Sequence, residues 1–316
     1  MEIPVVKVAH LSHRYSVQWA IRDINFEIYQ KGILGLLGSN GAGKSTTMNI
    51  MCGVLNQTEG EVYINGVNFR TDPIQAKMNI GFLPQKPPLY TDLTVDEYLR
   101  FCAELRSVPP KEITKAVEFA KQKCGIAHFS KRVVKFLSGG YQQRVGIAQA
   151  IIHNPKFVVL DEPTNGLDPN QILEIRQLIK EIAQERSVLL STHILSEVEA
   201  TCDHIKMIEE GRLVFSGTIM EFNNYIQPNT FVVTFKRPPE GHELMTIPGV
   251  VQVEKLSEPT FRVQFDTNED ITCRVVDRSV AQGWELSEIS IERCSLDTVF
   301  AQLSGKQGRI EEAHAV

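Results

Sequence analysis

One segment restricts the fold of this chain more than any other: residues 38–46 read Gly-Ser-Asn-Gly-Ala-Gly-Lys-Ser-Thr. The apolar run at 33–37 predicts a buried strand before it, and the segment at 48–52 predicts the start of a helix behind it. Strand, glycine-rich loop and helix in this order are typical of a phosphate-binding loop. Glycines let backbone amides converge on a polyphosphate, and the helix dipole places its positive end at the same point.

The residues of this loop predict a site for a nucleoside triphosphate with magnesium. We expect Lys44 to reach the outer phosphates and the Ser45 hydroxyl to be a ligand of Mg²⁺. An ordinary glycine-rich turn is the alternative, and the complete pattern in this context disfavours it. The loop leaves open what the energy of the nucleotide is used for. The expected nucleotide contacts are Gly38, Ser39, Asn40, Gly41, Ala42, Gly43, Lys44, Ser45 and Thr46.

Length and composition describe an ordinary globular protein of two domains. The chain has 316 residues, which is longer than most single domains, and 42% of them are hydrophobic. A net charge of −5 gives no sign of a nucleic-acid binder, and no apolar run approaches the length of a membrane span. The six cysteines show no zinc spacing, and the N-terminus does not resemble a secretory signal. We therefore expect a cytosolic protein with reduced thiols.

Two carboxylates follow a second apolar strand. Residues 157–160 form an unbroken apolar run, which is typical of a central parallel strand, and Asp161 and Glu162 come directly after it. Ligands of such sheets bind beyond the carboxyl ends of the strands. We expect Asp161 to hold Mg²⁺, through water. Glu162 is then expected to orient and deprotonate the water that attacks the γ-phosphate.

Three single residues are weaker candidates. Gln85 ends the short strand predicted over 79–85 and could supply its carbonyl oxygen to Mg²⁺ or to the attacking water. His193 follows the strand predicted over 187–191 and could donate to the γ-phosphate. Tyr15 follows the first strand and could stack on an adenine base. A loop glutamine, a structural histidine and a packed surface tyrosine are the alternatives, and local sequence leaves them open.

A helical insertion is predicted between two halves of the α/β sheet, from residue 86 to residue 136. Directly behind it lies the segment 137–144, Leu-Ser-Gly-Gly-Tyr-Gln-Gln-Arg. Ser138 is a good N-cap, and Gly139 and Gly140 leave the amides of the first turn exposed. This helix start predicts a second anion site. Without further context, an ordinary serine-capped helix is the alternative.

Taken together and in this order, these motifs resemble the ATP-binding subunit of an ABC transporter. The resemblance covers about two-thirds of the chain, and no catalytic position departs from the family pattern. It implies an α/β P-loop NTPase fold over residues 1–227, with a helical subdomain at about 86–153, and an ATPase that uses ATP and Mg²⁺. It also implies a homodimer in which Ser138, Gly139 and Gly140 of one copy bind the γ-phosphate held by the phosphate loop of the other.

Residues 228–304 predict a small second domain. Strand, short helix, two strands, helix and strand suggest a ferredoxin-like α+β unit, and Ser295 is expected to cap a final helix. Residues 305–316 are polar and predicted to be disordered. The unit resembles the extension of ATPases that drive ABC-2 type exporters, near the gliding-motility-associated and drug-exporter groups. We expect it to serve dimerisation, regulation or partner contact, with a structural extension as the alternative.

The resemblance implies a transport motor that docks on a separate polytopic permease at the cytoplasmic face of the membrane. No nucleic-acid partner is expected. The resemblance of the second domain to exporter ATPases favours export as the direction of transport. The alternative is a soluble ABC-type ATPase of translation or DNA repair, but those proteins usually carry long coiled coils or two nucleotide domains in one chain. A nucleotide-binding scaffold without turnover is a third possibility, and the presence of Glu162 argues against it.

Overall fold

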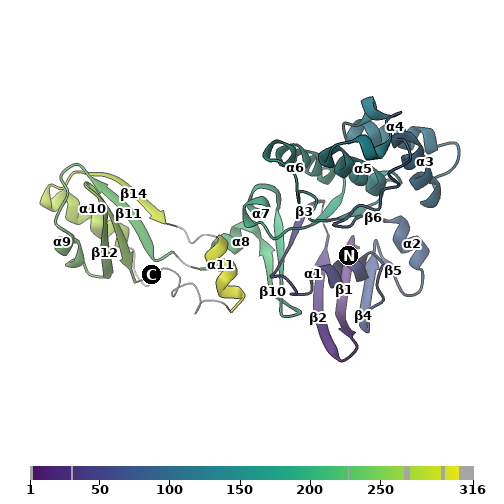
Figure 1. The fold of residues 1–316 in the computed structure, drawn as a ribbon. Helices are drawn as coiled ribbons and strands as arrows, with labels where there is room; N and C mark the ends of the chain where they lie inside the picture. The colour runs from purple at the N-terminus through teal and green to yellow at the C-terminus, as the bar shows by residue number, and fades with distance from the viewer. Residues whose placement is uncertain (1–2, 30, 227, 267–270, 293–295, 306–316) are drawn as a thin grey trace. The chain divides into compact units, whose positions relative to one another are not determined.

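The computed structural model describes residues 3–29, 31–226, 228–266, 271–292 and 296–305. It divides into two compact units, residues 1–219 and 220–316 (Figure 1). Ser295 and residues 306–316 of the predicted tail lie outside the described residues. Among the helices of the described ranges, none has the length and apolar character needed to cross a bilayer.

A six-stranded sheet forms the centre of the first unit. Its order is β10-β9-β3-β8-β7-β6, and every neighbouring pair is parallel except β9 and β10. Every residue of β8 and the first four residues of β7 are buried, so the prediction of central parallel strands is confirmed. The strands are β3 (Gly32–Leu37), β6 (Ile80–Leu83), β7 (Phe157–Asp161), β8 (Ser187–Ser191), β9 (His204–Glu209) and β10 (Arg212–Thr218).

A four-stranded antiparallel sheet packs against the same core. Its order is β2-β1-β4-β5, with β1 (Val6–Tyr15), β2 (Gln18–Ile28), β4 (Glu59–Ile64) and β5 (Val67–Asn68). Helix α1 (Lys44–Met51) lies in one apolar cluster with residues of both sheets, and Met48 and Met51 are fully buried there. Burying such a side chain stabilises the fold by roughly 1.5–3 kcal/mol. Since α1 follows the phosphate loop directly, this packing fixes the loop on its helical side.

Helices cover the other side of the six-stranded sheet. Helix α5 (Gly139–Ile151) packs on β6 and β7, and α6 (Pro169–Ala183) packs on β3 and β8. The predicted helical insertion consists of α3 (Val95–Leu105) and α4 (Ile113–Lys123), which contact each other and α5 (Figure 1). Thr94 and Glu97 form a capping box that starts α3. The other helical segments of the first unit are α2 (Pro73–Met78), α7 (Leu195–Thr201) and two 3₁₀ turns, Ala127–Phe129 and Val134–Phe136, and α8 (Ile219–Asn223) begins at its last residue.

The second unit contains its own sheet and core. Its sheet order is β12-β13-β11-β14, and all neighbouring strands are antiparallel. Alternate residues of β11, Phe231, Val233 and Phe235, are fully buried, as period-2 alternation predicts. The ferredoxin-like classification of this unit stays a prediction. Its elements are β11 (Thr230–Phe235), α9 (Gly241–Met245), β12 (Val250–Ser257), β13 (Thr260–Phe265), α10 (Ile271–Gln282), β14 (Leu286–Glu292) and α11 (Leu296–Leu303).

Candidate active site

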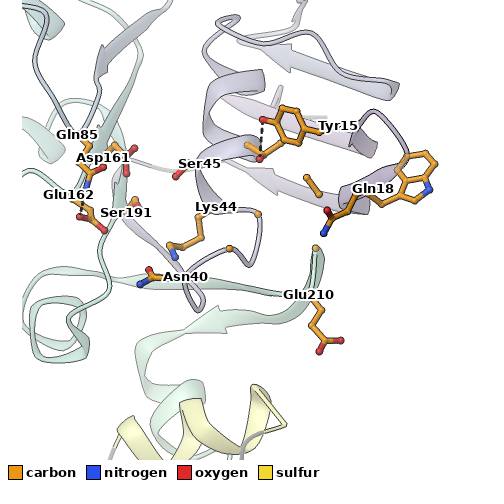
Figure 2. Close-up of a pocket in the computed structure, with 16 residues that line it drawn as sticks. Tyr15, Gln18, Asn40, Lys44, Ser45, Gln85, Asp161, Glu162, Ser191 and Glu210 are labelled. Atoms are coloured by element: carbon orange, nitrogen blue, oxygen red, sulfur yellow. Dashed lines mark hydrogen bonds between the residues drawn. The ribbon is translucent and has the colours of Figure 1, made fainter.

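A cavity of about 670 Å³ lies in the first unit, at the carboxyl ends of β3, β7 and β8. This is the edge at which open α/β sheets bind ligands. In Figure 2, Gln85, Asp161 and Glu162 lie on one side of the phosphate loop and Tyr15 lies on the other. The cavity is lined by Tyr15, Gln18, Trp19, Ala20, Asn40, Gly41, Gly43, Lys44, Ser45, Thr46, Gln85, Asp161, Glu162, Ser191, Glu210 and Gly211.

The backbone of the phosphate loop depends on glycine at two positions. Gly38 has φ +152°, and a Cβ there would lie 2.1 Å from the carbonyl oxygen of Ile208. Gly43 has φ +110°, and a Cβ there would lie 2.5 Å from Cγ2 of Ile21. Both backbones approach their neighbours more closely than a side chain permits. The two glycines therefore hold the loop against β9 and β2.

Lys44 lies inside the loop. Its ammonium nitrogen Nζ donates to the carbonyl oxygens of Gly38 at 2.8 Å and Ser39 at 3.0 Å, and the residue is buried. Burial lowers the pKa of Lys44, while the carboxylates of Glu162, Asp161 and Glu209 oppose that shift. A buried cation with carbonyl partners alone is poorly compensated. An anionic ligand at the loop would supply the missing negative charge.

The carboxylate of Glu162 is held by three side chains from separate segments. Its Oε2 accepts from Gln85 Nε2 at 2.8 Å and from Asn165 Nδ2 at 3.1 Å, and its Oε1 lies 3.0 Å from His193 Nδ1. The backbone of Glu162 is left-handed, with φ +47°, and its N–H donates to the carbonyl oxygen of Ser191. A non-glycine residue in this conformation is uncommon and is stabilised here by its surroundings. The carboxylate thus has a fixed place in the cavity wall.

Asp161 carries the second carboxylate of the cavity. Burial raises the pKa of Asp161 and the neighbouring charge of Glu162 raises it further, while a hydrogen bond with Ser191 and the charge of Lys44 oppose the shift. A bound cation would remove this penalty. Over the part of the chain that the structure describes, no three His, Cys, Asp or Glu side chains form a metal cluster. The oxygen donors that line the cavity with Asp161, from Ser45 and Gln85, are of the kind that Mg²⁺ accepts when phosphate oxygens complete its shell.

Not every predicted site residue lines the cavity. Ala42 is buried in the core, and Ser39 donates through its N–H and Oγ to the carboxylate of Glu209, at 3.1 and 2.5 Å. His193 reaches Glu162 rather than the cavity. Sequence reasoning did not include Glu209, because its bond to Ser39 spans 170 residues of chain.

The predicted second anion site is separate from the cavity. Ser138, Gly139 and Gly140 are absent from its lining residues. Ser138 is the extended N-cap of α5, and its side chain makes no capping hydrogen bond. A Cβ at Gly139 would meet nothing within 4 Å, whereas one at Gly140 would lie 2.7 Å from the side chain of Gln171, so this turn is open at Gly139. The predicted second anion site thus lies apart from the cavity at the phosphate loop of the same chain.

Two aromatic residues lie at the other end of the cavity. Tyr15 is 52% exposed, and its hydroxyl lies 3.5 Å from Thr46 Oγ1. Trp19, which sequence reasoning missed, has the guanidinium carbons of Arg14 and Arg22 5.7 and 5.4 Å from its ring centroid. Both residues line the cavity from the hairpin in which Tyr15 pairs with Gln18. The two-residue turn at 16–17, between β1 and β2, was the signal that could have found Trp19.

Comparisons with known proteins agree with this geometry. The family described as ABC transporter matches residues 21–165, and a family described as AAA domain, putative AbiEii toxin, Type IV TA system, matches residues 138–199. The bacitracin transport ATP-binding protein BcrA of Bacillus licheniformis is 38% identical over 212 residues, which is 66% of this chain and 68% of that protein. The BcrA of Enterococcus faecalis is 31% identical over 310 residues, which is 98% of this chain and 94% of that protein.

A solved structure gives the same result for the fold. The dimeric structure of a post-hydrolysis state of the ATP-binding cassette MJ0796, bound to ADP and Pi, matches with a TM-score of 0.61 and 26% identity. The match covers 68% of this chain and 98% of that one. Because the chain spans nearly the whole length of a relative at 31% identity, it belongs to the ABC transporter ATP-binding proteins and is an ATPase subunit of that family.

Proposed function

We propose that two copies of this chain enclose two ATP molecules, and that closing and opening of the pair drives transport. The observation that carries the proposal is the separation of the two anion-binding features. Ser138, Gly139 and Gly140 do not line the cavity that contains Lys44. In a head-to-tail pair related by a two-fold axis, the helix start of one copy completes the phosphate loop of the other. That the similar MJ0796 structure is a dimer supports this arrangement.

In the proposed hydrolysis, each polar side chain around the phosphate loop has its own role. Lys44 binds the β- and γ-phosphates, and Ser45, Asp161 and Gln85 hold Mg²⁺. Glu162 accepts a proton from water while the water oxygen bonds to the γ-phosphorus and ADP leaves. His193 orients the Glu162 carboxylate through Nδ1, which lies 3.0 Å from Oε1. A contact from His193 to the γ-phosphate stays a prediction.

The proposed cycle follows from the charge of the nucleotide. Intact ATP carries the γ-phosphate that both half-sites need, so its binding favours the closed pair. Hydrolysis and release of phosphate remove that shared charge, and the open pair is favoured again. The aromatic end of the cavity, with Tyr15, would receive the adenine base.

The dimer proposal is tested by a substitution at the helix start. Ser138→Arg places a bulky side chain where the partner's phosphate is expected. In a Glu162→Gln background, which limits hydrolysis, we expect this variant to bind ATP with unchanged affinity and to remain monomeric by analytical ultracentrifugation. Thr114→Arg, at an exposed position of α4, is the matched control and should dimerise with ATP. An ATP-dependent dimer of Ser138→Arg would contradict the shared site.

We further propose that the motor docks on a separate permease at the cytoplasmic face of the membrane and drives export. The names of the BcrA relatives, which describe bacitracin transport, support a role in transport. The expected docking surface is the helical insertion with Gln85 at its entrance. Detergent extraction from the native cell should recover the chain with a polytopic membrane protein. Recovery with ribosomes or DNA instead would favour a soluble role.

A further inference from the structure

A buried carboxyl group connects the two segments that carry Glu162 and His193. Glu197 lies on α7 and is 2% exposed. Its Oε2 accepts from the hydroxyl of Thr164 at 2.8 Å and from the hydroxyl of Thr192 at 2.9 Å. Thr164 comes two residues after Glu162, and Thr192 comes directly before His193. A single oxygen atom therefore bonds both segments.

The surroundings of Glu197 argue against a purely stabilising role. Its Oε1 has no hydrogen-bond partner among the described residues, and Nη2 of Arg176 lies 3.6 Å away. Removing a carboxyl group from water is costly unless its partners are close and complete. Two neutral hydroxyls and a longer ion pair compensate this cost only in part. An apolar side chain would fill the same space without the penalty, but it could not connect the two hydroxyls.

The bonds of Glu197 also have defined directions. Thr192 Oγ1 accepts from the N–H of Ile194 at 3.1 Å, so its proton is left to point at Glu197. Thr164 is buried and makes its side-chain hydrogen bond to the same oxygen. Each hydroxyl is thereby fixed relative to its own backbone, and Glu197 fixes the two backbones relative to each other.

We infer that Glu197 is a positioning residue for ATP hydrolysis. This inference rests on the proposed role of Glu162. It holds Thr164 and Thr192 so that the Glu162 carboxylate stays within hydrogen-bond distance of His193. A base must lie within hydrogen-bond reach of the water that it deprotonates. Losing the connection lets the two segments move independently, so the rate of the chemical step falls while binding at the phosphate loop is unaffected.

The test removes one hydroxyl at a time. Thr164→Val and Thr192→Val keep the shape of the side chain. We expect each to lower kcat about tenfold, within the range that small misplacements of catalytic groups cost, and to leave KM for ATP unchanged. Thr164→Ser keeps the hydroxyl and should restore kcat. Thr201→Val is the matched control: its buried hydroxyl on the same helix has no partner among the described residues, so kcat should not change.

The double variant distinguishes a shared connection from two separate effects. If both hydroxyls act through Glu197, Thr164→Val combined with Thr192→Val should be about as slow as either alone, since the first loss already breaks the connection. Losses in kcat that multiply would overturn the inference, as would normal turnover of Thr164→Val. Should the valine variants fail to fold, Glu197→Met removes the accepting oxygen at a similar side-chain length. It should show the same loss of kcat at unchanged KM, and a normal rate there would also overturn the inference.

Glu162→Gln, assayed in parallel, separates this inference from the proposal beneath it. Normal hydrolysis by Glu162→Gln would remove Glu162 as the base, and with it the basis of the positioning role. Loss of hydrolysis in Glu162→Gln together with normal turnover in Thr164→Val would refute the role of Glu197 alone.

Discussion

The two edges of the six-stranded sheet both carry charged and polar side chains, but they differ in access. At the carboxyl edge, Lys44, Asp161 and Glu162 line the 670 Å³ cavity. At the amino edge, His153 and Arg186 lie before β7 and β8. Nε2 of His153 donates to the carbonyl oxygen of Ile80 at 2.9 Å. A cavity of about 540 Å³ adjoins this edge too, but Nδ1 of His153 and Nη1 of Arg186 are closed off from solvent and have no hydrogen-bond partner in the described part of the chain.

This difference shows that solvent accessibility and hydrogen-bond pairing determine whether a charged or polar side chain can act on a ligand. The carboxylate of Glu162 has three donors and remains in contact with the cavity, so its arrangement can act on a ligand. The unpaired nitrogens at the amino edge cannot reach one, and their burial acts on the stability of the fold. We therefore expect substitutions at the carboxyl edge to change turnover with little change in stability. Substitutions at the amino edge should change stability with little change in turnover.

The largest expected effect is at the carboxyl edge. Glu162→Gln removes the proposed base and should lower kcat by about 10²–10⁴-fold, as loss of a general base typically does. The amide keeps the size of the side chain, so the free energy of unfolding should change by less than about 1 kcal/mol. Single-turnover hydrolysis and denaturant unfolding measure the two quantities. The comparison between the edges would break if the variant unfolded readily while hydrolysing ATP normally.

Sequence reasoning located the carboxyl edge because its residues lie in contiguous patterns. The loop at 38–46 and the pair Asp161 and Glu162 each follow an apolar strand, and parallel strands bring their ends to one edge. Bonds between distant segments leave no such pattern. The contact of His193 with Glu162 spans 31 residues, and that of Thr164 with Glu197 spans 33.

The amino edge was not predicted at all. His153 and Arg186 are single residues without a motif, and only the packing of α5 and β8 shows that Arg186 is buried and His153 half-buried. In the second unit, alternation predicted the buried residues of β11, because a half-buried strand has a period of two. Periodicity and adjacency thus reveal elements and their edges. They do not reveal which isolated polar side chains the fold encloses.

A smaller effect is expected at the amino edge and depends on pH. Burial lowers the pKa of His153 to about 4, the charges of Arg106 and Arg186 add to this shift, and the bond to Ile80 opposes it. An unfolded histidine has a pKa of about 6.5, so between pH 4 and 6.5 the unfolded state binds more protons than the folded state. The neutral ring therefore contributes stability that is complete above about pH 6.5 and is lost as the pH falls toward 4.

From this shift we expect the free energy of unfolding to fall by about 1 kcal/mol between pH 7.5 and 5.5 on account of His153. Urea unfolding at both pH values measures the difference, and His153→Gln, which does not titrate, should reduce the fall by that amount. Its kcat at pH 7.5 should match that of the unsubstituted chain, because the site lies at the opposite edge. An unchanged pH dependence in His153→Gln would show that the ring is not enclosed. A strong loss of kcat would show that the two edges are coupled. Turnover and stability would then not depend on separate edges of the sheet.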